Sequence, residues 1–195
     1  MAVGKKVLEQ YFQSGKSLLV GGVGGGREAL ALCKLGYKVE AFECNPNLVD
    51  FANELMQQEG FMPNIKLAPR DRCPNSNNEY DGIIVGWGAY MLIQGRNKRI
   101  AFLQSIHQQV KINAPLLVSF FDYSRVQIYH KIIAKIANLI KLFLGGELIE
   151  PGDTLVPDYV HYFTKDEIER EFKEAGFELI MYSNDEYGHA VGLAK

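Results

Sequence analysis

A short apolar run that passes directly into a glycine-rich turn constrains this 195-residue chain more than any other feature of its sequence. Leu18, Leu19 and Val20 follow the polar Ser17, and glycines occupy five of the next six positions. This pattern is typical of a parallel strand buried on both faces. We expect a helix over residues 27–35, whose free N–H groups and positive dipole end favour a carboxylate or phosphate. Since glycines let the backbone approach a ligand, the turn predicts a cradle for a small anionic cofactor.

Composition limits the classes of protein that the rest of the chain can form. With 47% hydrophobic and 23% charged residues, it predicts a single domain over residues 1–195 with a sizeable core. A net charge of −2 without a local basic patch argues against a nucleic-acid partner. Three cysteines with no C-x-x-C pair argue for a reducing, cytoplasmic location and against a metal site. Residues 1–16 resemble a short amphipathic helix without the apolar core of a signal peptide, so no stable membrane insertion is expected.

The order of elements predicts an α/β fold. Strands separated by helical segments imply right-handed crossovers and a parallel sheet, whereas the last two strands follow each other across a short turn-rich link. We therefore expect a doubly wound, mostly parallel seven-stranded sheet with a C-terminal antiparallel hairpin. The strands after the first are expected at residues 37–43, 64–68, 81–86, 114–121, 177–183 and 190–194, and the helices after the glycine turn at 46–58, 97–110 and 164–175.

The spacing of the glycines does not match either of two familiar phosphate-binding motifs. A phosphate loop needs G-x-x-x-x-G-K-[ST] after a strand, but here Gly15-Lys16-Ser17 precedes the strand and Gln10 stands at the first glycine position. A dinucleotide fingerprint aligned on Gly22 and Gly24 needs a small residue three positions later, where this chain has Arg27. The glycine turn alone therefore identifies no cofactor.

Acidic residues at the ends of the next strands narrow the choice. Glu43 ends the second strand, the position from which a carboxylate reaches a ribose diol, although a solvated glutamate is the plainer alternative. Asp71, past the third strand, can accept a hydrogen bond from an adenine amino group, but aspartate is also ordinary in such a loop. In a doubly wound sheet these strand ends and Gly86-Trp87-Gly88 would border one crevice, which indicates a nucleoside site.

Taken together, these residues resemble the class I S-adenosylmethionine (SAM)-dependent methyltransferases. That family combines a strand, a G-x-G-x-G turn, an acid closing the second strand, an acidic or polar residue after the third, and a terminal antiparallel hairpin. The resemblance runs from about Ser17 to the C-terminus, except between Phe121 and Tyr162. The positions that it assigns to SAM are Gly22, Val23, Gly24, Gly26, Glu43, Cys44, Asp71, Arg72, Gly86 and Trp87.

One position departs from the family pattern. Members often carry an acid two residues before the first glycine of the turn, and here that residue is Val20. The acid usually helps to organise the turn around the methionine end of SAM. Its absence implies either a compensating group, such as Glu28, or weaker cofactor binding.

The reaction that the resemblance implies needs few catalytic groups. The methyl group of SAM is already activated, so catalysis can come from placing the acceptor in line and excluding water. Our catalytic candidates are His161, Asp122 and Tyr90. His161 and Asp122, with His130, could act as a base where one is needed, Tyr90 would orient the acceptor, and a buried hydrogen-bonded histidine is the alternative for His161. The candidates for contacting the substrate are Tyr123, His130 and Tyr162.

An insertion at about residues 124–160 exceeds what a crossover needs. Isoleucine or leucine recurs every four residues from Ile128 to Leu144, which predicts a helix with a wide apolar stripe. The simplest expectation is a helical lid over the sheet edge; a homodimer contact and transient membrane contact stay open. A lid favours a small, partly apolar acceptor.

The sequence therefore predicts SAM-dependent methyl transfer to an oxygen or nitrogen atom of a small molecule. A nicotinamide-dependent oxidoreductase is the alternative enzyme, disfavoured by Arg27 and by the terminal hairpin. A non-catalytic SAM-binding or scaffold domain is a third hypothesis, because Val20 replaces the usual acid and no residue is clearly identified as a general base.

Overall fold

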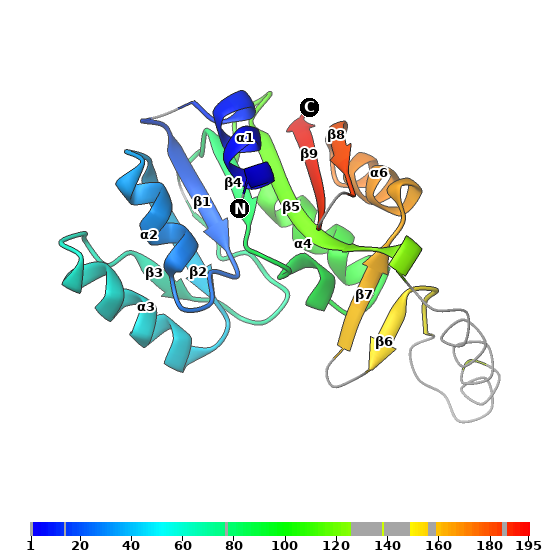
Figure 1. The fold of residues 1–195 in the computed structure, drawn as a ribbon, viewed down its shortest axis with the longest axis horizontal. Coiled ribbons are helices and arrows are strands. Elements are labelled where there is room, and N and C mark those ends of the chain that lie inside the picture. The colour runs from blue at the N-terminus through cyan, green and yellow to red at the C-terminus, as the bar shows by residue number, and fades with distance from the viewer. Residues whose placement is uncertain are drawn as a thin grey trace.

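Helices cover both faces of one central sheet in the computed structural model of the chain (Figure 1). The structure describes residues 2–13, 15–76, 78–125, 138, 149–155, 159–184 and 187–195. The stripe from Ile128 to Leu144, apart from Asn138, and the substrate candidate His130 lie outside these residues.

The first five strands run parallel in the order β3-β2-β1-β4-β5. Val20 of β1 pairs with Ala41 on one side and with Ile84 on the other. This arrangement brings the carboxyl ends of the strands to one edge of the sheet, as the sequence predicts. The strands are β1 (Ser17–Gly21), β2 (Lys38–Glu43), β3 (Ile65–Leu67), β4 (Gly82–Val85) and β5 (Pro115–Asp122).

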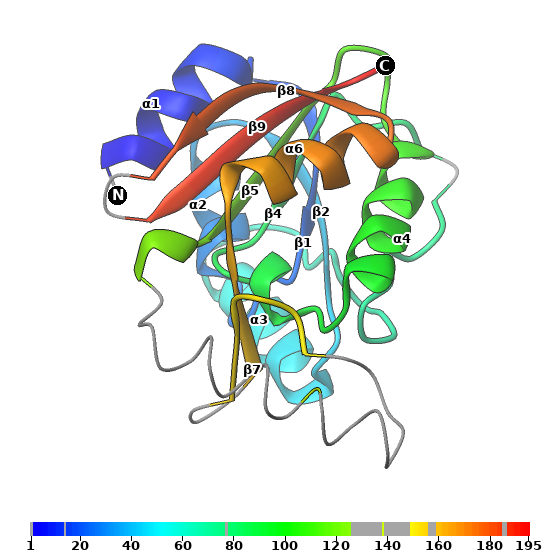
Figure 2. The same cartoon turned by 90° about the vertical axis from the view of Figure 1, so that its right-hand side faces the viewer.

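The predicted C-terminal hairpin is confirmed. β8 (Phe177–Ser183) and β9 (Gly188–Ala194) are antiparallel, and β9 also pairs antiparallel with β5. Figure 2 shows β8 and β9 side by side with β5, with α6 (Lys165–Glu174) along them. Thr164 begins α6 with a capping box, since its hydroxyl accepts from the Glu167 N–H and the Glu167 side chain accepts from the Thr164 N–H.

A second hairpin corrects the expectation that the insertion is helical up to about residue 160. β6 (Asp153–Leu155) and β7 (Tyr159–Phe163) are antiparallel, and β7 continues the sheet by pairing in parallel with the end of β5. β7 is a run of β-branched and aromatic residues around one histidine, a composition that suits a strand. Its pairing with β5 is a long-range contact that no local pattern indicates.

Among the described residues, three helices cover one face of the sheet and two cover the other. α1 (Ala2–Tyr11), α2 (Arg27–Lys34) and α3 (Pro46–Gln58) pack on the first face; α4 (Arg96–His107) and α6 pack on the second, with the 3-10 turn η1 (Tyr90–Leu92). Another 3-10 turn, η2 (Tyr123–Arg125), follows β5. No helix lies among the described residues between β3 and β4, where the sequence is rich in proline and asparagine.

The buried side chains form one cluster on each face of the sheet. Within β1, Leu18 and Val20 belong to the cluster under α1, α2 and α3, whereas Leu19 belongs to the cluster under α4 and α6. Burial on both faces explains why the strand is continuously apolar. None of the helices in the described part of the chain has both the length and the apolar character needed to cross a bilayer.

Candidate active site

The glycine turn between β1 and α2 is held at both ends and open in the middle. Gly22, Gly24 and Gly26 have positive φ angles of 66°, 52° and 83°, which favour glycine. A Cβ on Gly22 would lie 2.5 Å from the Cβ of Ala89, and one on Gly26 would lie 2.8 Å from the Cβ of Ala52. A Cβ on Gly24 would meet no atom within 4 Å. The middle of the turn is therefore free to approach a ligand.

A cavity of about 400 Å³ opens beside this turn at the carboxyl edge of the sheet. Its size falls within the range of small-molecule sites, roughly 300–1,000 Å³. The structure brings seven of the predicted cofactor residues to its wall: Gly22, Gly24, Glu43, Cys44, Asp71, Arg72 and Trp87. The wall also contains Gly21, Phe42, Asn45, Leu48, Pro69, Arg70, Val85, Ala89, Leu92, Ile93 and Phe102, which the sequence analysis did not assign to the site.

The three other predicted cofactor residues, Val23, Gly26 and Gly86, shape the turn rather than line the cavity. Gly86 shows the reason, because a Cβ at this position would lie only 2.4 Å from the carbonyl oxygen of Gly22. Its N–H donates to the carbonyl of Gly21 at 2.7 Å. The end of β4 thus packs directly against the glycine turn, and only glycine permits this approach.

Glu43 holds a buried carboxylate at the end of β2. Its Oε2 accepts from the Gly24 N–H at 2.9 Å, and its Oε1 accepts from the N–H groups of Cys44 at 2.8 Å and Asn45 at 3.1 Å. Burial would raise the pKa of Glu43, but these hydrogen bonds outweigh it and lower the pKa below its ordinary value. A carboxylate oxygen has about two acceptor positions, so Oε2 can accept one further hydrogen bond.

Glu28, in the first turn of α2, lies where the glycine turn meets the end of β4. Its Oε2 accepts from the Trp87 N–H at 3.2 Å and is 3.0 Å from the position of a Cβ on Gly86. Burial raises the pKa of Glu28, although the Trp87 N–H and nearby Arg27 act in the opposite direction. Val20, by contrast, is fully buried among apolar side chains, where a carboxylate would be costly.

The wall away from the glycine turn combines charged and apolar groups. Asp71 has a positive φ of 59°, which aspartate tolerates better than most residues. Arg70 Nε lies 3.9 Å from Asp71 Oδ1. Leu48 and Leu92 are 37% and 41% exposed. Their separation in sequence explains why sequence analysis missed them, since only the fold brings α3 and η1 to the same cavity.

Tyr90, a predicted catalytic residue, is fully buried and does not line this cavity. Its ring stacks on Phe163 with the centroids 5.1 Å apart, and its hydroxyl donates to Glu171 Oε2. Burial, reinforced by the Glu171 carboxylate, raises the pKa of Tyr90 far above its ordinary value. Tyr90 therefore stays protonated and links η1 to α6.

His161, the second catalytic candidate, is also fully buried and away from the cavity wall. Its Nδ1 lies 2.6 Å from Asp153 Oδ1, which also accepts from the Tyr159 hydroxyl at 2.8 Å. Burial would raise the pKa of Asp153, but these bonds and the Glu150 N–H lower it. Because the ionised Asp153 can only accept, Nδ1 carries the proton in this pair.

A buried ion pair joins this group to α4 and α6. Arg99 is fully buried and donates to Glu171 through Nε and Nη2, and its Nη2 lies 2.7 Å from Glu150 Oε2. One ligand atom each from Glu150, Asp153 and His161 lies within 4.8 Å of the others. The carboxylates of Glu150 and Asp153 and the Nδ1 of His161 are engaged by Arg99 and by one another, so we assign no metal to them. The buried Nε2 of His161 has no hydrogen-bond partner among the described residues.

Asp122, the third catalytic candidate, ends β5 and lies outside the cavity wall. Its Oδ1 accepts from the Ser124 N–H at 2.9 Å, and its Oδ2 accepts from the Tyr182 hydroxyl at 2.5 Å. Burial would raise the pKa of Asp122, but Ser124, Tyr182 and Asn184 lower it. The carboxylate is thus ionised and engaged by its neighbours.

Of the two described substrate candidates, Tyr123 directly follows β5 and Tyr162 lies within β7. Tyr123 begins η2, and the ring of Tyr162 lies 5.3 Å from that of Phe121. Neither residue lines the cavity beside the glycine turn.

Cys33, Cys44 and Cys73 are all free thiols.

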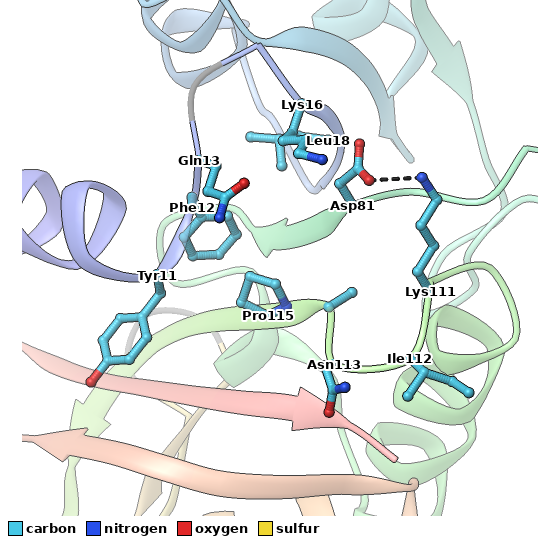
Figure 3. Close-up of a pocket in the computed structure, with 11 residues that line it drawn as sticks. Tyr11, Phe12, Gln13, Lys16, Leu18, Asp81, Lys111, Ile112, Asn113 and Pro115 are labelled. Atoms are coloured by element: carbon cyan, nitrogen blue, oxygen red, sulfur yellow. Dashed lines mark hydrogen bonds and ion pairs between the residues drawn. The ribbon is translucent and has the colours of Figure 1, made fainter.

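A second cavity of about 230 Å³ lies at the opposite, amino-terminal edge of the sheet (Figure 3). Leu18, Asp81 and Pro115 reach it from the starts of β1, β4 and β5. Lys111 Nζ lies 2.8 Å from Asp81 Oδ1, and the other oxygen of Asp81 accepts from the Ser17 N–H. The glycine turn and Glu43 are at the other edge, so the cofactor prediction does not involve this cavity.

The strand order, the terminal hairpin and the cavity at the carboxyl edge define the fold of the class I SAM-dependent methyltransferases. A SAM-dependent methyltransferase structure from Methanosarcina mazei matches with a TM-score of 0.73 and 16% identity, over 96% of each chain. One from Clostridium acetobutylicum matches with a TM-score of 0.73 and 11% identity, over 98% of this chain and 89% of that one.

A further solved structure with this fold is the magnesium protoporphyrin IX methyltransferase from Synechocystis, with bound S-adenosylhomocysteine (SAH). The TM-score is 0.67 and the identity 12%, over 100% of this chain and 81% of that one. The sequence itself matches no protein-family model and no curated protein. At these identities the comparisons show the fold.

Proposed function

We propose that this chain is a SAM-dependent methyltransferase that transfers a methyl group to an oxygen or nitrogen atom of a small, partly apolar molecule. The observation that carries the proposal is the cavity between the open glycine turn and Glu43, on the fold of the class I methyltransferases. A glycine turn and a fixed carboxylate facing one cavity suit a ligand with a carboxylate at one end and a ribose in the middle.

The residues around the cavity fit SAM in three places. The backbone of the glycine turn and the start of α2 would hold the carboxylate of the methionine moiety. Glu43 Oε2 would accept from a ribose hydroxyl, and the apolar side chains of Leu48 and Leu92 would pack on the adenine, with Asp71 at its amino group. When bound, SAM supplies an activated methyl group.

Glu28 does not line the cavity itself, but its position behind the glycine turn supports the methionine end of this assignment. Its carboxylate lies beside Gly86, where the glycine turn meets β4, and no lysine or arginine is within salt-bridge distance of it in the described part of the chain. An ammonium group is the natural partner for a partly buried carboxylate. Glu28 would thereby supply the negative charge that Val20 lacks in β1.

The chain's contribution to the reaction is proposed to be placement and exclusion of water. Tyr90 and His161 would act as positioning residues, because both are buried in the contacts that join η1, α4, α6 and β7. The Tyr90 hydroxyl, the His161 Nδ1 and the Asp122 carboxylate are all engaged by neighbouring side chains. The acceptor's proton would therefore leave to solvent or to a group on the acceptor itself. Aligning acceptor and methyl group can supply most of the rate in such a displacement.

Turnover tests the proposal directly. The protein is incubated with SAM and a panel of small phenols, amines and carboxylic acids, and SAH formation is followed. Methylation of at least one acceptor is expected, and Glu43→Ala should slow it at low SAM concentration. SAM binding without turnover of any acceptor would instead support the non-catalytic binding domain, and binding of NAD in place of SAM would support the oxidoreductase.

A further inference from the structure

Four aromatic side chains form a continuous row beside the cofactor cavity. The rings of Trp87 and Tyr187 are 4.4 Å apart, those of Tyr187 and Phe121 are 6.0 Å apart, and those of Phe121 and Tyr162 are 5.3 Å apart. All three separations lie within the range of aromatic contact. The four residues come from the loop after β4, the link between β8 and β9, the end of β5 and β7. We call them the aromatic row.

Strand alternation turns the row to the opposite face from the buried rings of the core, although Phe121 also packs against the edge of that core. Phe121 and Tyr162 are direct partners in the parallel pairing of β5 with β7, so their side chains lie on the same face. Their neighbours Phe120 and Phe163 point to the other face, where their rings pack 5.5 Å apart and are almost fully buried. Each strand thus carries one aromatic residue for the core and one for the row.

The side chains of the row are more exposed than the aromatic side chains of the core. Trp87 is 49% exposed, and Phe121, Tyr162 and Tyr187 are partly exposed. Large aromatic side chains gain by burial, and a cluster of them left partly open marks a site for a ligand. Trp87 also lines the cofactor cavity, so the row begins where that cavity ends.

We propose that the aromatic row binds the methyl acceptor, and that this acceptor carries an aromatic ring. The proposal rests on the methyltransferase function above. A ring-shaped acceptor can stack against the row while its reacting atom points toward the cofactor cavity at Trp87. The hydroxyls of Tyr162 and Tyr187 can hydrogen-bond to a polar substituent on that ring.

The charges near the row favour a neutral ring over a cationic acceptor. Asp122, the carboxylate at the end of β5, is turned to Ser124 and Tyr182. Glu28 accepts from the Trp87 N–H and is assigned above to the ammonium group of SAM. Among the described residues, no other carboxylate is hydrogen-bonded to a member of the row, so a cation would depend on ring faces alone.

Trp87 provides a reporter for this site because it is the only tryptophan in the chain. Its indole N–H gives a single resonance in a nitrogen-correlated NMR spectrum, which responds to a ring placed next to it. The protein is titrated with 2-naphthol and with decahydro-2-naphthol, which share the same ring skeleton and hydroxyl but differ in aromaticity. Tetramethylammonium serves as the cationic probe, and each titration is run with and without saturating SAH.

We expect 2-naphthol to shift the indole signal saturably and to bind about threefold to tenfold more tightly than decahydro-2-naphthol. Tyr187→Leu should remove most of this preference, whereas Tyr187→Phe should keep it, because the ring and not the hydroxyl is responsible. SAH affinity should be unchanged in both variants, since Tyr187 does not line the cofactor cavity.

Equal affinity for the aromatic and saturated alcohols, absence of saturable binding by either, or a preference for tetramethylammonium would each overturn the proposal. Loss of the aromatic preference in Tyr187→Phe would also contradict it. A wild-type protein that binds 2-naphthol in this way but not SAH would leave the aromatic site in place and refute the cofactor assignment, so the two failures are distinguishable.

Discussion

At the scale of single residues, Glu43 shows how the backbone fixes a carboxylate beside the cavity at the carboxyl edge of the sheet. Backbone N–H groups from the glycine turn and from the start of α3 hold this carboxylate in place and lower the pKa of Glu43. A group fixed in this way loses little freedom on binding, which favours affinity. The same bonds limit it to one free acceptor position on Oε2.

Replacement of Glu43 by alanine tests this role. Glu43→Ala should weaken SAM and SAH binding by about 1 to 3 kcal/mol, because a ribose hydroxyl loses its acceptor. Isothermal titration calorimetry measures the difference. Glu59→Gln, at the exposed end of α3 with its surface ion pair to Lys34, is the matched control and should bind as the wild type does. Unchanged affinity in Glu43→Ala would remove Glu43 from the site.

Glu28 gives a separate residue-scale prediction. Glu28→Gln should lower the affinity for SAH about tenfold or more, because an ammonium group loses its charged partner. Adenosine, which lacks the methionine moiety, should bind equally to both proteins. Burial raises the pKa of Glu28, so SAH affinity of the wild type should decline as the pH falls through that raised value and protonates the carboxylate. An equal loss for adenosine and SAH would contradict the assignment.

The residue scale also shows what the sequence can and cannot reveal. Glu43 is recognisable because it ends an alternating strand at a fixed distance from the glycine turn. Tyr90 and His161 carry suitable chemistry at suitable positions along the chain. The burial of Tyr90, however, depends on Phe163 and Glu171, which are distant in sequence, and Asp153 engages His161 across the β6–β7 hairpin. Chemical type alone therefore does not separate a buried positioning group from one that meets a substrate.

At the scale of elements, the β6–β7 hairpin is the part of the fold that the sequence did not predict. The parallel strands are short apolar runs between glycines and helices, and this pattern is local. The hairpin itself is local, with Asp153 opposite His161, but its place in the sheet depends on pairing with the far end of β5, which no local pattern contains. Figure 1 shows it extending the sheet beyond the end of β5.

Acid should destabilise this hairpin through Asp153. The folded pKa of Asp153 is lowered, since hydrogen bonds from His161, Glu150 and Tyr159 outweigh its burial. Its contribution to stability is therefore fully present above the unfolded pKa of about 3.9 and is lost as the pH falls through the lowered folded pKa.

We expect Asp153→Asn to reduce the free energy of unfolding by about 1 to 3 kcal/mol at pH 7. The difference from the wild type should shrink as the pH falls below about 4. Urea denaturation at a series of pH values measures both. Asp50→Asn, an exposed position on α3, should behave as the wild type does. A difference that stays constant with pH would show that ionisation of Asp153 does not stabilise the fold.

At the scale of the whole molecule, one edge of the sheet collects groups that the chain supplies from distant segments. The glycine turn, Glu43, Asp71 and Trp87 follow four different strands and meet at one cavity, because parallel strands place all their carboxyl ends together. This explains how the chain shares its fold with methyltransferase structures that are only 11% to 16% identical to it. The fold needs the order of apolar strands, turns and helices, and few particular residues.

Calorimetric titration of the protein with SAM, SAH and NAD tests the central claim most directly. We predict saturable binding of SAM and SAH at one site per chain and no comparable binding of NAD. Tight binding of NAD with none of SAM or SAH would contradict the account.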